Sequence, residues 1–223
     1  MGRRLSHRLG DRLRGAWLIG SAILGDFAPE RSDLDVQAVT TGVLPERERW
    51  ELALTLSHES LPCPARGLEF VLYAEPDLHQ ANGPAFQLNL NTGARMPRHM
   101  ALDPAEDPRF WFVLDVAAAR AHGRRLAGVP AEVALPELPR RLVLRALLDA
   151  IAWYRRPAAE GGEAALAAAR GWAWASDGRW RSKREAAAWA RGRTDEEHLI
   201  AAAEAALTAQ LAATGPVRPG GGG

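Results

Sequence analysis

Four residues near the start of the chain have the types and the spacing that phosphate chemistry needs. Gly20 and Ser21 end a short apolar run, and two aspartates, Asp33 and Asp35, follow after eleven further residues. A Gly-Ser turn offers bare backbone N–H groups and one hydroxyl to a phosphate. Aspartates spaced two apart on a strand point their carboxylates to the same face. Because Mg²⁺ binds one or two carboxylates together with phosphate oxygens, the set predicts a magnesium–phosphate site.

Glu69 is a candidate third carboxylate, on a strand expected over residues 67–73. If this strand neighbours that of Asp35, the carboxylates converge, and such like charges repel strongly unless a cation is present. Asp-x-Asp alone is common, and Gly-Ser after an apolar run is by itself an ordinary turn. The combination indicates a nucleotidyltransferase site, with coincidence or a decayed relic of such a site as the alternative.

Strands and helices must position these residues. Apolar runs predict strands over 16–19, 34–39 and 67–73. Leu5, Leu9, Leu13 and Ala16 recur at helical spacing and predict an amphipathic first helix. Further helices are expected over 45–57 and 110–126, and the Pro-, Asn- and Gly-rich residues 76–108 are expected to form a long irregular functional loop.

The second half of the chain differs in character. Residues 128–139 hold three prolines and are a candidate linker. Beyond them alanine dominates, and helices are expected over 140–155, 163–176, 182–190 and 195–211. We therefore expect an N-terminal domain over 1–130, a helical domain over 138–213 and a disordered Gly/Pro tail over 214–223.

The Gly20-Ser21 and Asp33-x-Asp35 pattern resembles the signature of the DNA polymerase β-like nucleotidyltransferase superfamily. Within it, the chain is most similar to the aminoglycoside (streptomycin/spectinomycin) adenylyltransferases. The scattered positions that carry this likeness are Leu68-Glu69, Phe86-Gln87-Leu88, Leu126-Ala127-Gly128, Ala169-Arg170-Gly171-Trp172, Lys183 and Ala186-Ala187-Ala188-Trp189-Ala190. The resemblance implies an α+β chain: an N-terminal nucleotidyltransferase domain with a mixed β-sheet flanked by helices, then a C-terminal α-helical bundle.

The resemblance also implies an enzyme that uses ATP and Mg²⁺ to move AMP to a hydroxyl of an aminoglycoside or aminocyclitol, with release of pyrophosphate. Each implied role belongs to a numbered position: Asp33 and Asp35 hold magnesium, Gly20, Ser21 and Ser32 contact the triphosphate, Glu69 is the general base, and Arg170 and Lys183 reach the phosphates from the helical domain. Positioning and cations then supply most of the rate.

Lys183 is conspicuous for a separate reason. Arginine supplies all but one of the 28 basic residues, and Lys183 is the exception. An ammonium is a compact point charge and a guanidinium a planar fork, so some phosphate sites do not exchange them. The one lysine stands where the resemblance places a nucleotide-binding lysine, although a solvated residue at a helix start is the alternative.

Departures from the family pattern bear on the acceptor. Streptomycin-modifying members have a Trp where this chain has Asn91, and an Asp where it has Glu160. A Tyr that packs by the adenine has no counterpart. Asn91 and Glu160 are the expected acceptor contacts; the first disfavours streptomycin, while the second still offers an anion to a cationic sugar. Spectinomycin or another hydroxylated metabolite stays open.

Composition narrows the partners and the setting. A net charge of +1 does not favour a nucleic-acid binder, and no apolar stretch approaches the length of a membrane span. A single cysteine, Cys63, fits a reducing cytoplasm. We expect a cytoplasmic monomer that binds ATP and a small molecule. The alternatives are an antitoxin-type enzyme that AMPylates a protein, usually a minimal single domain, and a non-catalytic nucleotide-binding regulatory module.

Overall fold

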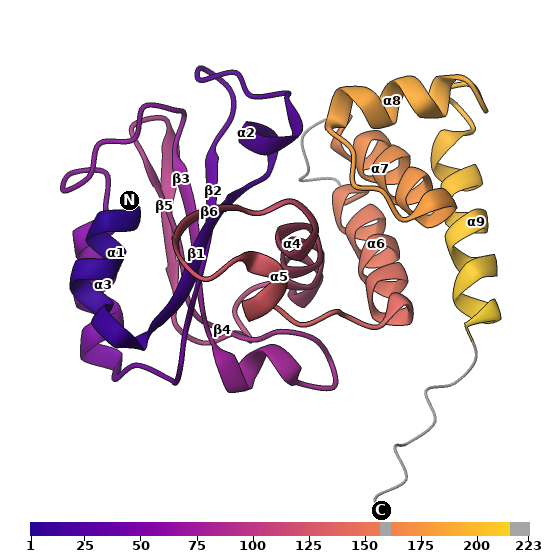
Figure 1. The fold of residues 1–223 in the computed structure, drawn as a ribbon. Coiled ribbons are helices and arrows are strands. Elements are labelled where there is room, and N and C mark those ends of the chain that lie inside the picture. Colours follow the sequence, from indigo (N-terminus) through magenta and orange to yellow (C-terminus); the bar gives the residue numbers. More distant parts are fainter. Residues whose placement is uncertain (157–161, 215–223) are drawn as a thin grey trace, which may run out of the picture. The chain divides into compact units, whose positions relative to one another are not determined.

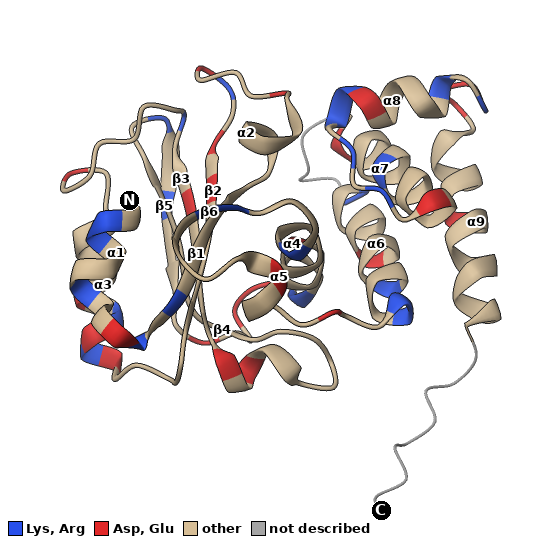
Figure 2. Ribbon diagram, in the orientation of Figure 1, with Lys and Arg blue, Asp and Glu red and all other residues tan. Residues whose placement is uncertain are grey.

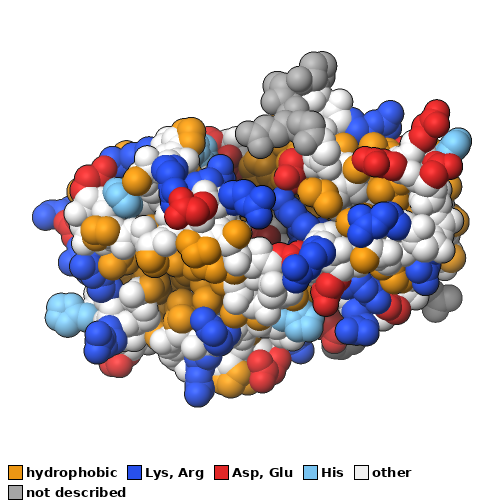
Figure 3. Space-filling model, turned by 90° about the horizontal axis from the view of Figure 1, so that it is seen from above, with side chains coloured by type: hydrophobic (Ala, Val, Ile, Leu, Met, Phe, Trp, Pro, Cys, Tyr) orange, Lys and Arg blue, Asp and Glu red, His pale blue; other side chains and the backbone are white. Residues whose placement is uncertain are grey.

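The computed structural model describes residues 1–156 and 162–214. The chain has an α+β fold that divides into two compact units, Met1–Leu138 and the residues from Pro139 onward (Figure 1). Basic and acidic side chains are mixed on the face seen in Figure 3, in keeping with the near-neutral net charge. Every helix within the described ranges is too short or too polar to span a bilayer.

The first unit is built on a six-stranded mixed sheet with the order β5-β4-β3-β2-β1-β6. Its strands are β1 Leu13–Ile19, β2 Leu34–Thr40, β3 Leu68–Ala74, β4 Phe86–Gly93, β5 Met96–Ala101 and β6 Arg124–Gly128. β2 and β3 are parallel, and all other neighbours are antiparallel. The three strands expected from the apolar runs are therefore confirmed: β1 begins three residues earlier than expected, β2 ends one residue later, and β3 is shifted by one residue.

Helices cover both faces of this sheet (Figure 1). They are α1 Gly2–Leu9, α2 Ser21–Leu24, α3 Glu46–Leu56, α4 Arg109–His122 and α5 Ala131–Ala134, with 3-10 turns η1 Gly10–Arg12 and η2 Glu75–His79. On one face, Leu68, Phe70 and Leu72 pack in the core with α1 and α3. On the other, Val71 and Tyr73 pack with α4 and α5. This alternation is the one expected for β3.

Three expectations for the N-terminal half are wrong, the first of them over residues 76–108. Residues 76–108 are not a long irregular loop, because they contain η2 and the antiparallel pair β4–β5. Two of the three asparagines there, Asn89 and Asn91, are strand residues of β4. Asn89 is buried in the sheet, and it alternates with the fully buried Leu88 and Leu90. Asparagine is unfavourable in strands in general, but Asn89 lies on the polar part of one face of the sheet. Its place in a strand therefore depends on the tertiary contacts that it makes there.

The first helix also differs from expectation. It ends at Leu9, because Gly10 takes a positive φ of 55° and reverses the chain. Leu13 and Ala16 then lie in β1 rather than on a helix. The fourth helix ends at His122, and residues 124–128 return as the edge strand β6 instead of continuing the helix.

The second unit consists of helices in its described part: α6 Arg140–Tyr154, α7 Glu163–Asp177, α8 Lys183–Arg191 and α9 Leu199–Ala213. α7 packs against each of the other three. Ser182 and Glu185 form a capping box that begins α8. The last helix begins at Leu199 rather than at residue 195, because the Asp195 carboxylate accepts the His198 N–H (2.9 Å) in the preceding turn. Of the expected disordered tail, only Thr214 lies within the described residues.

Candidate active site

The parallel register of β2 and β3 places two acidic residues side by side. Asp35 is the direct partner of Glu69, so both side chains lie on the same face at a strand spacing of about 4.8 Å. Acidic positions accordingly mark β2 and β3 in Figure 2. The structure thus brings together two of the three predicted carboxylates, and the adjacency that the sequence left conditional is present.

Burial is the largest cause that raises the pKa of Asp35 well above its usual range, and the carboxylates of Glu69, Asp115 and Asp33 raise it further. A hydrogen bond between the Asp35 and Glu69 side chains acts in the same direction. Crowded carboxylates of this kind favour a bound cation or a shared proton.

Asp115 is a site residue that the sequence reasoning missed. It lies on α4, and its charge also raises the pKa of Tyr73, whose phenol is buried on the same face of the sheet. A signal was available: Phe112, Val116 and Ala119 form the buried stripe of α4, and Asp115 falls within that stripe at helical spacing. An acidic residue in an apolar helix stripe indicates a partner on the opposing sheet.

Gly20 contacts the Asp35 carboxylate directly. Its backbone has φ 68° and ψ −148°, a region used almost only by glycine. A Cβ built on Gly20 would lie 1.9 Å from Asp35 Oδ2, so no other residue fits without moving that carboxylate. The Gly20 carbonyl accepts the N–H groups of Ile23 and Leu24 (both 3.1 Å), which starts α2 at Ser21. The predicted phosphate turn and the predicted metal ligand are therefore in contact.

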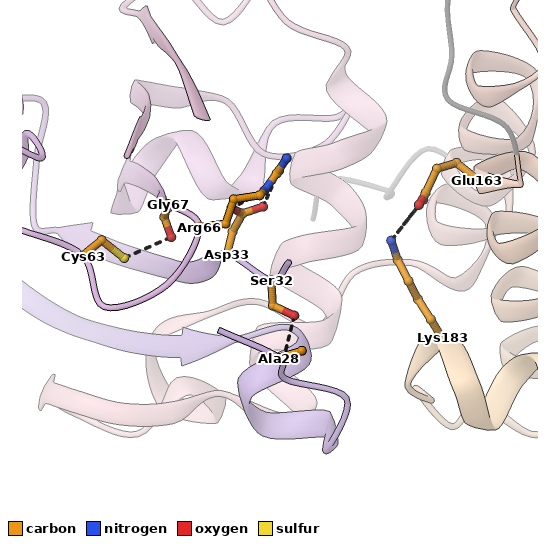
Figure 4. A network of polar contacts seen from close by, with 8 residues as sticks. All are labelled: Ala28, Ser32, Asp33, Cys63, Arg66, Gly67, Glu163 and Lys183. Atoms are coloured by element: carbon orange, nitrogen blue, oxygen red, sulfur yellow. Dashed lines mark hydrogen bonds and ion pairs between the residues drawn. The ribbon is translucent and has the colours of Figure 1, made fainter. Parts of the chain in front are cut away.

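Ser32 and Asp33, just before β2, are both held by neighbours (Figure 4). The Ser32 hydroxyl accepts the Ala28 N–H (3.0 Å), and its own proton is left to donate. Arg66 holds both oxygens of Asp33, through Nε to Oδ1 (3.0 Å) and Nη2 to Oδ2 (2.7 Å). No sequence signal marked Arg66, since it is one of many arginines and only the β2–β3 register brings it to Asp33.

The acidic residues fit Mg²⁺ only together with a phosphate ligand. Within residues 1–156 and 162–214, no three His, Cys, Asp or Glu side chains are grouped closely enough to bind a metal by themselves. Asp35 and Glu69 offer adjacent carboxylates in need of positive charge, and Mg²⁺ commonly takes only one or two carboxylates plus phosphate oxygens. Both oxygens of Asp33 accept hydrogen bonds from Arg66, so Asp33 would have to exchange this partner to serve as a metal ligand.

Asn91, an expected acceptor contact, lies next to the acidic pair. It is the β4 partner of Glu69 in the antiparallel ladder. The other expected acceptor contact, Glu160, lies outside the described residues.

The second unit carries the two predicted phosphate-binding cations. Lys183 is the first residue of α8, and its Nζ donates to both carboxylate oxygens of Glu163 (3.1 and 3.0 Å; Figure 4). Arg170 is half-buried on α7, and its Nε–H has no acceptor among the residues described. A buried donor without a partner is costly, which marks Arg170 as a candidate for binding an anion.

We compared the chain with protein-family models, curated proteins and solved structures. The chain shares its α+β fold with an adenyltransferase of known structure, although no protein-family model and no curated protein matches its sequence. A solved structure with this fold is the spectinomycin adenyltransferase AAD(9) from Enterococcus faecialis, crystallised with ATP and spectinomycin. The chain is 18% identical to it with a TM-score of 0.60, over 94% of this chain and 86% of that chain. At this identity the likeness establishes the fold.

Proposed function

We propose that the protein is an ATP- and Mg²⁺-dependent adenylyltransferase that moves AMP to a hydroxyl of a small aminoglycoside or aminocyclitol and releases pyrophosphate. The observation that carries the proposal is the pairing of Asp35 with Glu69 directly against the Gly20 turn. The fold shared with an enzyme crystallised with ATP and spectinomycin supports it. Spectinomycin is the first candidate acceptor, because Asn91 stands where streptomycin-modifying relatives are expected to have a Trp.

The first unit has groups for each part of this reaction. The Gly20 turn and the Ser21 and Ser32 hydroxyls would hold the triphosphate. Mg²⁺ bound by Asp35, and by Asp33 once released from Arg66, would neutralise charge on the triphosphate and on the leaving pyrophosphate.

Glu69 would act as the general base. It takes the proton of the acceptor hydroxyl as that oxygen bonds to the α-phosphorus, while the bond from the α-phosphorus to the β-phosphate oxygen breaks and the electron pair leaves with pyrophosphate. Its place beside Asp35 puts the base next to the site of charge neutralisation. General-base catalysis of this kind contributes about 10²–10⁴-fold.

Arg170 and Lys183 of the helical unit would bind the phosphates. In the structure the Lys183 ammonium is paired with Glu163, so on phosphate binding it would exchange one anionic partner for another, and the partly exposed Glu163 carboxylate would be left to solvent. The cytoplasmic location, the monomeric state and the absence of a nucleic-acid partner stay predictions.

The direct test is a pyrophosphate-release assay with ATP and Mg²⁺ across spectinomycin, streptomycin and other aminoglycosides, with mass spectrometry to detect the adenylylated product. E69Q should lower kcat about 10²–10⁴-fold with little change in the KM for ATP. E46Q, an exposed glutamate on α3 beyond the opposite face of the sheet, is the matched control. Absence of pyrophosphate with every acceptor, or equal loss of kcat and ATP affinity in E69Q, would overturn the proposal.

A further inference from the structure

Asp35, Glu69 and Asn91 form a row of polar residues across neighbouring strands of the sheet, and this row continues onto β5. Asn91 is the partner of His99 on β5, so Asp35, Glu69, Asn91 and His99 occupy successive strands on one face. Two strand spacings, about 10 Å, separate His99 from Glu69. The next row on the same face places the buried polar side chains of Gln37 and Asn89 on either side of Val71. Beyond it Val39 and Tyr73 pack in the core with α4. The row of Asp35, Glu69, Asn91 and His99 is thus the polar end of a face that becomes apolar further along the strands.

His99 is held in a fixed orientation by a buried carboxylate. Its Nε2 lies 3.0 Å from Asp107 Oδ2, and the Asn89 amide donates to the same oxygen (2.9 Å). The Asp107 side chain is only 9% exposed, whereas the His99 side chain is 42% exposed. A carboxylate oxygen can only accept a hydrogen bond, so Nε2 carries the ring hydrogen. In the neutral ring, Nδ1 can then accept a hydrogen bond from a ligand. No partner contacts Nδ1 in the part of the chain that the structure describes.

The positions along the row determine which ligand can meet His99. The Gly20 turn follows β1 and lies against Asp35 on β2, so the nucleotide belongs to that end of the row. Glu69 on β3 must meet the reacting hydroxyl of the acceptor. The rest of the acceptor then extends away from the nucleotide, over β4 and β5, where Asn91 and His99 lie.

We infer that His99 binds the acceptor, with Nδ1 accepting a hydrogen bond from a hydroxyl or ammonium group of a cationic polyol. This inference rests on the proposed function. Asp107 fixes the ring and places a negative charge behind it, which favours ligands with amino groups over neutral sugars. Asp107 and Asn89 are positioning residues, because they reach the ligand only through the imidazole.

The test separates the two ring nitrogens. In H99Q the amide nitrogen can still donate to Asp107, but the acceptor Nδ1 of the ring is replaced by a carbonyl oxygen at a different position, whereas H99A loses both interactions. H7Q is the matched control, since His7 is exposed on α1 beyond the opposite face of the sheet. For each variant we would measure KM for acceptor and for ATP, the Kd for spectinomycin by calorimetry, and Tm.

H99Q should raise the acceptor KM and the spectinomycin Kd about tenfold, the effect of one lost hydrogen bond, with the ATP KM and Tm unchanged. An acceptor KM and Kd within about twofold of the wild type, or an equal rise in the ATP KM, would overturn the role of His99. If the wild type binds spectinomycin but transfers no AMP, the proposed reaction fails while the Kd of H99Q still decides the role of His99. If it neither binds nor modifies any aminoglycoside, both proposals fail.

Discussion

Replacement of Asp35 by asparagine should abolish AMP transfer and yet make the protein more stable at neutral pH. In the folded chain burial and three neighbouring carboxylates raise the pKa of Asp35 well above its usual range. The folded state therefore binds this proton more tightly than the unfolded state. As the pH rises from the ordinary carboxyl pKa through the raised one, the folded state loses stability relative to the unfolded state. Asparagine has no proton to lose, so D35N escapes this loss.

The magnitude follows from the strand register. Two carboxylates on adjacent strands lie about 5 Å apart, and at an effective dielectric constant of about 20 their repulsion is about 3 kcal/mol. The hydrogen bond between Asp35 and Glu69 relieves part of it. We expect D35N to raise the free energy of unfolding by about 1–3 kcal/mol at pH about 8, and by much less at pH about 3, below the ordinary carboxyl pKa, where the carboxyl is mostly protonated in both states.

Urea unfolding followed by circular dichroism at several pH values, without Mg²⁺ or nucleotide, measures this difference. D11N, at an exposed aspartate on η1, is the control and should show no comparable gain. A D35N variant that is less stable than the wild type at pH about 8, or whose stability difference does not grow with pH, would refute the reasoning about the acidic pair.

Two further substitutions test the nucleotide side of the site. G20A should lower the free energy of unfolding by about 1–3 kcal/mol through backbone strain, and it should strongly reduce AMP transfer because its Cβ must displace the Asp35 carboxylate. Unfolding titrations measure the first effect and pyrophosphate release measures the second. A fully active G20A would show that the contact between Gly20 and Asp35 is dispensable. K183R can keep the ion pair with Glu163, so its Tm should match the wild type while its KM for ATP rises; an unchanged KM would mean that the lone lysine is only a surface residue.

Local patterns in the sequence accounted for much of the fold. The segments that became β1 and β3 contain uninterrupted apolar runs, and in β2 apolar residues alternate with Asp35 and Gln37; both patterns predict strands. The β4–β5 pair was missed because its asparagines and prolines resemble those of loops, and its strand character depends on the partners that it meets in the sheet.

The candidate site shows the same division. Gly20, Ser21, Asp33 and Asp35 lie close together in the sequence, so the sequence alone indicated that they could bind phosphate and magnesium. Asp115 and Arg66 could not be placed in this way. Asp115 reaches Asp35 from α4, and Arg66 reaches Asp33 from just before β3, through packing and strand register.

The sequence by itself determined which residues could bind phosphate and magnesium, because local spacing sets the face on which strand side chains lie. Only the tertiary structure decided which of them meet. The β2–β3 register pairs Asp35 with Glu69, and the β3–β4–β5 ladder continues the row to Asn91 and His99. The physical reason is that a shift of one residue in any strand would turn its side chain to the opposite face, and register is set by the packing of the whole sheet.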